Sequence, residues 1–326
     1  MVKSELTTPV LFLCFNRPDN TRRVFESIRA VHPQKLYVAI DGPRENREDD
    51  RVKREEVIGI VKNVDWECET HYLIHENNLG CSLSGFTAWR WFFEYEDKML
   101  FIEDDGLGNE SAFFFVQEML DKYALDERIA YIGGVNYGMT YGNASYFFSR
   151  YPAATYFMGT WKRVFEKYEY EVESYNRTKR SIQYIRHFNS IDEYICVNRG
   201  IHRYVKSIKK GERLNTYDIQ MIYLSYKYNM YSIYPNINMV SNIGLNDGAN
   251  NHVDVNDAFY KQYANRQRFN VEIIKDPVNV IIDKSFEKAF YKLRCLYGAS
   301  RLRAIVRALQ PDWVFRFRSL IHHKKK

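Results

Sequence analysis

The chain of 326 residues contains few cysteines, and their spacing provides no framework for covalent cross-links. They are odd in number, scattered and without a C-x-x-C pair: Cys14, Cys68, Cys81, Cys196 and Cys295. A disulfide scaffold or a structural zinc site would require paired spacings. The cysteine content therefore argues against both and favours a reducing compartment.

Hydrophobic runs of membrane length are also missing. The first residues, Met1 to Glu5, lead into a short strand-like segment and lack the apolar stretch of a signal peptide. No later segment supplies the roughly 18 apolar residues that a membrane-spanning helix requires. We therefore expect a cytoplasmic protein that is soluble or is peripheral on the inner face of the cell membrane.

Aromatic residues, in contrast, are abundant, at 16% of the chain with 26 Tyr and 21 Phe. A tyrosine ring stacks on sugars and bases while its hydroxyl keeps a polar partner, so the excess suits a protein that binds either. The codon usage of an AT-rich genome would produce the same excess. Composition leaves both interpretations open.

Segments typical of buried strands alternate with segments typical of helices through the first half of the chain. The strand-like segments are 9–15, 36–40, 69–74, 98–102 and 129–132. The helix-like segments are 21–30, with Asp19 or Asn20 as its cap, 48–61, 82–95 and 111–123. This alternation predicts an α/β fold, with a mostly parallel, doubly wound sheet flanked by helices. In such sheets ligands bind beyond the carboxyl ends of the strands.

The second half is less regular, and its last part differs in charge. Helices are predicted near 162–170, 182–187, 191–197 and from 216, with a strand at 231–235. We assign residues 1–255 to one catalytic domain and residues 256–326 to a basic helical extension. Beyond Lys284 apolar residues recur at helical spacing between many Lys and Arg, which predicts amphipathic basic helices. They would contact an anionic membrane surface or, alternatively, pack on the domain or a partner.

Polar clusters fall where the predicted strands end, and Glu103-Asp104-Asp105 is the central one. Three consecutive carboxylates repel one another and are costly to remove from water unpaired. A divalent cation, Mn²⁺ or Mg²⁺, would resolve this by taking carboxylate oxygens and leaving positions for phosphate oxygens. We predict Asp105 as a metal ligand and Asp104 as a partner of the ribose or of the metal ligands. The alternative is a solvated acidic turn.

The combination of motifs resembles a known family. The relevant segments are Pro9 to Arg17, Ile40 to Pro43, Asn78 to Gly80, Phe101 to Asp105, Ile132 to Asn136 and Ser241 to Gly244. In this order and spacing they are similar to bacterial GT-A glycosyltransferases that act on polysaccharides and are distantly like N-acetylglucosaminyltransferase I. The resemblance spans roughly residues 8 to 252 and implies a GT-A fold.

The resemblance implies roles for individual residues on the donor side. Phe15, Asn16 and Arg17 would hold the nucleotide, and Gly80 would belong to the same nucleotide-sugar site. Asp41 matches the acid that hydrogen-bonds the base or ribose, although the segment 41–43 is alternatively only a turn. Arg17 would face the nucleotide phosphates or, alternatively, pair with Asp19.

Two further residues come from the resemblance alone. Asp218 matches the acid that deprotonates the acceptor hydroxyl at the start of a late helix, and His252 matches an additional metal ligand. The alternatives are that Asp218 only favours a helix N-terminus and that His252 is an ordinary exposed histidine. Acidic residues 103–105 stand in for the D-x-D motif of the family.

Together these features predict a metal-dependent glycosyltransferase. It would move a sugar, with inversion, from a nucleotide-sugar donor, UDP-sugar favoured, to a glycan or lipid-linked glycan in surface polysaccharide biosynthesis. One alternative is a sugar-phosphate nucleotidyltransferase, which would need a Gly-rich basic loop where 15–18 reads Phe-Asn-Arg-Pro. Another is a non-catalytic glycan- or nucleotide-binding module. No nucleic-acid partner is expected, because no recognised module accompanies the basic tail.

Overall fold

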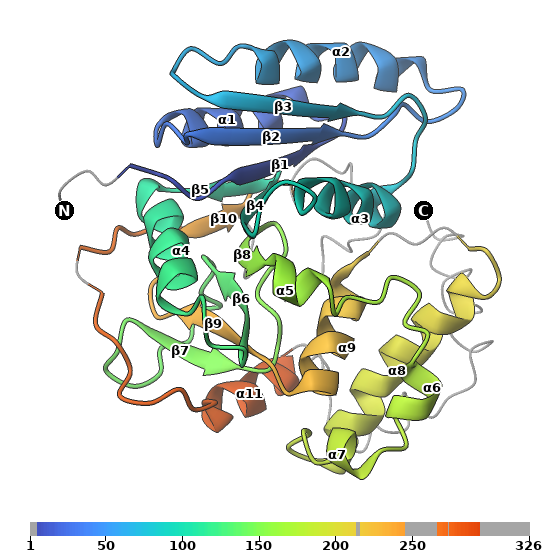
Figure 1. Cartoon of the computed structure of the whole chain (residues 1–326), viewed down its shortest axis with the longest axis vertical. Coiled ribbons are helices and arrows are strands. Elements are labelled where there is room, and N and C mark those ends of the chain that lie inside the picture. Colours follow the sequence, from blue (N-terminus) through green and yellow to red (C-terminus); the bar gives the residue numbers. More distant parts are fainter. Residues whose placement is uncertain (1–4, 213–215, 245–265, 273, 294–326) are drawn as a thin grey trace, which may run out of the picture.

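An eight-stranded sheet forms the centre of the structure, a computed structural model that describes residues 5–212, 216–244, 266–272 and 274–293 (Figure 1). The strand order is β3-β2-β1-β4-β8-β6-β9-β7. The strands are β1 (Val10–Cys14), β2 (Lys35–Ile40), β3 (Glu69–Ile74), β4 (Lys98–Glu103), β6 (Ile129–Gly133), β7 (Tyr146–Ser149), β8 (Phe157–Trp161) and β9 (Tyr231–Pro235). Strands β3, β2, β1 and β4 are parallel, as are β6 and β9, whereas β8 and β7 run antiparallel to their neighbours. The predicted α/β class with a mostly parallel sheet is confirmed.

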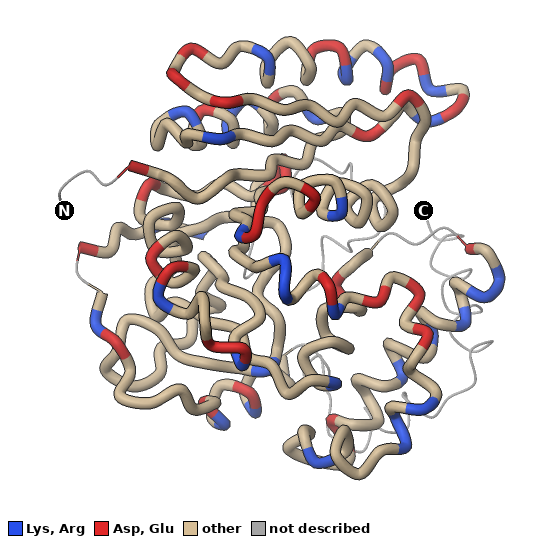
Figure 2. The backbone as a smooth tube through the Cα atoms, viewed as in Figure 1, with Lys and Arg blue, Asp and Glu red and all other residues tan. Residues whose placement is uncertain are grey.

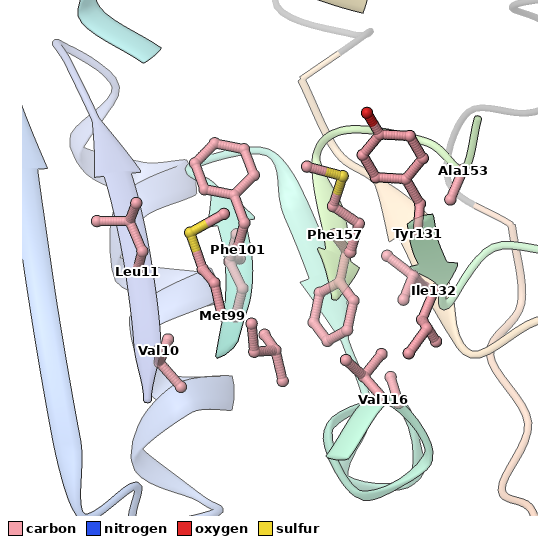
Figure 3. Packing of buried hydrophobic residues seen from close by; sticks show 14 of the residues in the cluster. Val10, Leu11, Met99, Phe101, Val116, Tyr131, Ile132, Ala153 and Phe157 are labelled. Carbon is pink, nitrogen blue, oxygen red and sulfur yellow. The ribbon is translucent and has the colours of Figure 1, made fainter. Parts of the chain in front are cut away.

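The chain forms ten helices in its described part, some covering the two faces of this sheet and others, α6 to α8, lying beside it (Figure 1). They are α1 (Pro18–Arg29), α2 (Glu48–Lys62), α3 (Cys81–Phe92), α4 (Glu110–Lys122), α5 (Lys162–Phe165), α6 (Tyr175–Thr178), α7 (Ile182–Ile185), α8 (Ile191–Ile208), α9 (Asp218–Tyr228) and α11 (Lys284–Tyr291). Trp89 of α3 packs edge-on against Phe101 of β4, with ring centroids 5.4 Å apart. Val116 of α4 lies on the opposite face, close to Gly159 (Figure 3). Because both faces are covered, the central strands are apolar throughout, as the continuous runs of the sequence indicate.

The strand order places a topological switch point between β1 and β4, the position at which doubly wound sheets form a ligand-binding crevice. From β1 the chain proceeds to β2 and β3 on one side, and then crosses back to β4 on the other side of β1. In doubly wound sheets the loops that follow the two strands at this reversal lead away in opposite directions, and ligands bind between them, beyond the carboxyl ends of the strands. The loops after β1 and β4 contain Arg17 and the acidic residues 103–105, so the topology brings these segments together.

Some predicted element boundaries were wrong, for identifiable physical reasons. Helix α1 begins at Pro18 with Arg17 at its N-cap, rather than with Asp19 or Asn20 as the cap, because proline suits the first helical position. The helix predicted over 162–170 ends at Phe165. The strand β8 that precedes it was not predicted. Its pairing with β4 and β6 joins segments distant in sequence, which local periodicity does not show.

A second, smaller core is formed by Val172 and by the helical subdomain, which we define as α6 to α9 (residues 175–228). Its buried members are Val172, Tyr175, Tyr184, Val197, Ile201, Tyr204, Val205, Tyr223 and Tyr226. More than half of these are tyrosines, and their hydroxyls find buried partners, as Tyr175 does at the carbonyl of Asn198, 2.8 Å away. The tyrosine excess therefore builds cores in this region rather than a ring-lined surface.

The beginning of the predicted basic extension packs on the main sheet. Helix α11 buries Phe286, whose ring lies 4.7 Å from that of Phe147 in β7 and 4.8 Å from that of Tyr234 in β9. Helix α11 therefore packs against the preceding domain. The predicted boundary at residue 255 and the rest of the extension, from residue 294, lie outside the described residues.

Glu287 of α11 is fully buried and connects three parts of the fold. Its carboxylate accepts hydrogen bonds from the backbone N–H of Arg150 (2.7 Å) and from Asn189 Nδ2 (2.7 Å), and it pairs with Arg150 Nη1 at 3.3 Å. Arg150 follows β7, and Asn189 precedes α8. This cluster thus joins the extension, the edge of the sheet and the helical subdomain.

Within the described parts of the chain, two global features bear on the sequence-based expectations. No helix there has both the length and the hydrophobicity to cross a membrane. Four of the cysteines, Cys14, Cys68, Cys81 and Cys196, are free thiols.

The buried cluster predicts a stability effect. We expect Glu287→Ala to lower the free energy of unfolding by about 3–5 kcal/mol, because it leaves the half-buried Arg150 guanidinium without its counter-charge and the groups around Glu287 without their acceptor. Urea unfolding followed by circular dichroism measures this. The exposed Glu94→Ala is the matched control and should change stability by less than about 0.5 kcal/mol. Equal unfolding midpoints for the two variants would contradict the assignment.

Candidate functional site

Arg17 and two of the acidic residues form an ion-pair cluster at the crevice between β1 and β4. Nη1 of Arg17 lies 3.2 Å from Asp104 Oδ1 and 3.3 Å from Asp105 Oδ2. Asp104 is held in place by its backbone N–H, which donates to the carbonyl of Leu13 in β1 at 3.0 Å. Both aspartates are buried. Arg17 therefore pairs with the residues that follow β4 and not with Asp19, which was the alternative.

The third carboxylate, Glu103, is connected to the start of α9. Tyr217 donates a short hydrogen bond from its hydroxyl to Glu103 Oε1. The Tyr217 ring packs edge-on against Trp89 of α3 at 5.5 Å, and it fits only because residue 85 is glycine: a Cβ there would lie 2.9 Å from the ring. This contact docks the N-terminus of α9 on the end of β4. Tyr217 was not identified from the sequence.

Asp218, the predicted base, follows directly as the first residue of α9. Its backbone N–H donates to Thr216 Oγ1 at 3.1 Å, and its side chain is partly buried. Its charge is close enough to Glu103 to contribute to raising the pKa of that carboxyl. The structure therefore brings Asp218 to the acidic residues 103–105, more than 110 positions away in the sequence. Its catalytic role stays a prediction.

The clustering of these acids shifts their pKa values upward. Desolvation, reinforced by Asp105, raises the pKa of Glu103 to about 8, and the hydrogen bond from Tyr217 opposes the shift. Desolvation likewise raises the pKa of Asp104 to about 6, against the effect of Arg17. The pKa of Asp105 is raised by burial in the same way. A cation that enters the site would be stabilised by this excess of acidic groups.

A two-stranded sheet encloses the acidic residues from a part of the chain far away in sequence. Strand β5 (Gly106–Gly108) pairs antiparallel with β10 (Val240–Asn242), and the backbone N–H of Ile243 donates to the Asp105 carbonyl at 2.9 Å. A Cβ on Gly244 would lie 2.7 Å from Asp105 Oδ2, so residue 244 must be glycine. The motif 241–244 is part of the resemblance, but its contact with Asp105 was not predicted.

Asp41 organises the turn at 77–80. Its carboxylate accepts hydrogen bonds from the backbone N–H of Leu79 (2.8 Å) and Gly80 (3.0 Å) and from Asn78 Nδ2 (2.9 Å). Gly80 has a φ of 79° and is the N-cap of α3, a backbone conformation that favours glycine. The two predicted nucleotide-sugar residues Asp41 and Gly80 thus belong to one hydrogen-bonded corner. Their contact with a ligand stays a prediction.

Phe15 and Asn16 face the loop that leads into α2. Asn16 Nδ2 donates to Asp50 Oδ1 at 2.6 Å, and Asp50 forms a bidentate pair with Arg44 at 2.6 and 2.7 Å. The Arg44 guanidinium lies 5.6 Å from the centre of the Phe15 ring. Residues 15 and 16 are therefore held beside a basic side chain at the end of β1. Arg44 and Asp50 were not predicted as site residues from the sequence.

The fit of a divalent metal depends on which oxygen atoms remain available. Oδ1 of Asp105 is buried and has no hydrogen-bond partner, whereas Oδ2 is paired with Arg17. Among the described residues no group of three or more His, Cys, Asp or Glu forms a protein cage for a metal. Mg²⁺ and similar ions are usually held by one or two carboxylates together with substrate phosphates, and Asp105 fits that arrangement. The other predicted ligand, His252, lies outside the described residues.

Comparisons of the sequence and of the structure with known proteins show only distant similarity. No family model and no curated protein matches the sequence. Among solved structures, HddC from Yersinia pseudotuberculosis is 10% identical with a TM-score of 0.30, over 49% of this chain and 80% of that one. Residues 1–349 of TarS from S. aureus are 10% identical with a TM-score of 0.34, and the match spans about half of each chain, 51%. Scores this low support no conclusion about activity.

The raised pKa of Glu103 predicts a pH-dependent stability. A carboxyl whose folded-state pKa is raised binds its proton more tightly when folded, so its contribution is present below about pH 4 and lost as the pH rises through about 8. We expect the wild type to lose stability relative to Glu103→Gln between pH 5 and pH 9. Urea midpoints of both proteins across this range measure the difference. Parallel pH profiles would contradict the expectation.

Proposed function

We propose that this protein is a glycosyltransferase that moves a sugar from a nucleotide-sugar donor to a glycan or lipid-linked glycan acceptor in surface polysaccharide biosynthesis. One observation carries the proposal: the fold gathers the acidic residues 103–105, Arg17 and Asp218 at the crevice between β1 and β4. Such crevices bind nucleotides in doubly wound sheets. The site combines groups for an anionic leaving group with a separate carboxylate for proton transfer.

On the donor side, charge decides what binds. The acidic residues disfavour a bare diphosphate, and Arg17 carries the single positive charge in direct contact with them in the described part of the site. We propose Mn²⁺ or Mg²⁺ as the cofactor, held by Asp105 through Oδ1, with His252 as a further ligand. A bound metal would neutralise the charge of the leaving diphosphate. Residues 15–17, Asp41 and Gly80 follow the parallel strands β1, β2 and β3, so they lie at the same edge of the sheet as the acidic residues, and they would hold the nucleotide, UDP favoured.

On the acceptor side, Asp218 is the base. As the first residue of α9, it projects from the end of a rigid helix whose position is set by the Tyr217–Glu103 hydrogen bond. Asp218 would take the proton of an acceptor hydroxyl while the oxygen of that hydroxyl attacks the anomeric carbon. Direct displacement of this kind inverts the configuration. A base held in this way contributes about 10²–10⁴-fold to the rate.

The first prediction concerns donor binding. In calorimetric titration, we expect UDP or GDP to bind in the presence of Mn²⁺ and not with EDTA, and we expect Asp105→Asn to abolish the metal-dependent part. Asp97→Asn is the matched control, because it alters an exposed aspartate that directly precedes β4, at the end of the strand opposite to the acidic residues. Its binding should equal that of the wild type.

The same titration separates the alternatives. Binding that is equal with Mn²⁺ and EDTA would refute the metal-dependent proposal. Release of pyrophosphate from a nucleoside triphosphate and a sugar 1-phosphate would identify a nucleotidyltransferase instead. Absence of binding for UDP, GDP, CMP and dTDP would refute the donor site altogether and favour a module that binds glycans only.

The second prediction concerns the base. We expect Asp218→Asn to slow the release of UDP from a bound UDP-sugar by about 10²–10⁴-fold, with water or a supplied glycan as acceptor, while the affinity for UDP stays unchanged. A loss of affinity equal to the loss of rate would mean that Asp218 holds the donor. An unchanged rate would refute its role as the base.

A further inference from the structure

The outer side of the helical subdomain has an unusual charge distribution. Between Ser174 and Gly211 the sequence contains nine Lys and Arg but only two acidic residues, Asp192 and Glu193. Both acids are buried: Asp192 accepts a hydrogen bond from the hydroxyl of Tyr291 at 2.9 Å, and Glu193 accepts one from that of Tyr226 at 2.7 Å. The surface of this segment is therefore positively charged, as the blue segments along α6 to α8 show (Figure 2).

At one end of this surface, large apolar side chains are exposed beside the cations. Ile182 is 67% exposed, Ile185 38% and Ile191 66%. Ile182 and Ile185 are three positions apart on the single turn of α7 and share its outer side. Ile191 is the first residue of α8. Single exposed apolar residues are ordinary, but three isoleucines within ten residues of a basic segment are a recognisable surface feature.

Aromatic rings hold α7 and the first turn of α8 together. The ring of Phe188, between α7 and α8, lies 5.1 Å from that of Tyr184 and 5.2 Å from that of Tyr194. On its other side Phe188 stacks on Tyr226 of α9 at 4.2 Å. The isoleucines are thus presented by a packed scaffold. We call α7 and the first turn of α8, with Arg177, Arg180 and Arg186, the α7 tip (Figure 1).

The cations of the α7 tip are available for an external partner. Arg177, Arg180 and Arg186 are exposed, and no carboxylate among the described residues forms an ion pair with them. Guanidinium groups bind phosphate oxygens through charge-assisted hydrogen bonds. Isoleucines next to such cations are characteristic of surfaces that enter the boundary between lipid headgroups and acyl chains. Among the described residues this patch presents no exposed aromatic ring for stacking on nucleic-acid bases.

We propose that the α7 tip docks on an anionic lipid surface, with Ile182, Ile185 and Ile191 entering the headgroup boundary and the three arginines binding lipid phosphates. The residues of the α7 tip belong to a different part of the sequence from the predicted basic extension beyond residue 293. Helix α9 runs from Asp218 to Tyr228, a length of about 16 Å, and its C-terminal part contacts α7 through the hydrogen-bond contact between His187 and the Tyr226 carbonyl. The acidic site lies near the N-terminus of α9 and the α7 tip near its C-terminus, so docking on lipid would not cover the acidic site.

Sedimentation with lipid vesicles tests the proposal on the full chain. We expect the wild type to bind vesicles of phosphatidylcholine with one-quarter phosphatidylglycerol, and to bind pure phosphatidylcholine far more weakly. Arg180→Gln/Arg186→Gln should weaken the partition to anionic vesicles about 30-fold, since each basic residue near an anionic surface contributes about 1 kcal/mol. Ile182→Ser/Ile185→Ser should weaken binding to the same vesicles at high salt, where charge is screened.

Matched controls exclude general effects of charge or folding. Arg22→Gln/Arg51→Gln removes two exposed arginines from α1 and α2, and Ile281→Ser removes an isoleucine that is 66% exposed elsewhere. Both controls should bind anionic vesicles as the wild type does. All substituted side chains are exposed, so the thermal unfolding midpoints, followed by circular dichroism, should agree among the variants.

Several results would overturn the proposal. One is equal vesicle binding by the α7-tip variants and the wild type, which would assign any lipid contact to another surface. Others are a wild-type dimer that Ile182→Ser/Ile185→Ser dissociates, or RNA binding that Arg180→Gln/Arg186→Gln removes in the absence of vesicle binding. The proposal is independent of the proposed transferase activity, because vesicle binding and nucleotide calorimetry measure different surfaces and either can fail alone.

Discussion

Three consecutive carboxylates at the end of a buried strand create a local excess of negative charge that the surrounding structure must balance. Arg17 pairs with two of them, and the Tyr217 hydroxyl donates a hydrogen bond to the third. Each partner comes from a different segment: the end of β1 and the start of α9. The electrostatic demand of residues 103–105 therefore couples the sheet to the helical subdomain, and the same contacts that satisfy it assemble the site.

Backbone constraints reinforce this coupling. Gly85 leaves room for the Tyr217 ring, and Gly244 leaves room for the Asp105 carboxylate. Gly106 passes so close to the Tyr156 carbonyl that a Cβ there would overlap with it. Gly106 begins β5, which pairs with β10.

The molecule combines two kinds of electrostatic surface. At the crevice, the acidic groups are desolvated, which favours the binding of a cation or a proton. Their charge therefore depends on pH and on whether a cation is bound. Around α6 to α8, cations are exposed and remain charged at any physiological pH. An enzyme that transfers a sugar to a lipid-linked acceptor would benefit from both, since one surface handles the leaving diphosphate and the other favours an anionic interface.

Local sequence patterns were enough to predict the α/β class, the bounds of most strands and the position of the acidic residues at a strand end. Those features follow from local hydrophobic runs and from turns, which adjacent residues encode. Local patterns did not predict β8, β5 and β10, nor the contacts of Tyr217 and Gly244 with the acidic residues. These depend on pairing between segments far apart along the chain, and only the packed tertiary structure decides which of them meet. The same holds for the α7 tip, because a sequence pattern does not show that the acids of its segment are buried while its isoleucines and arginines face solvent.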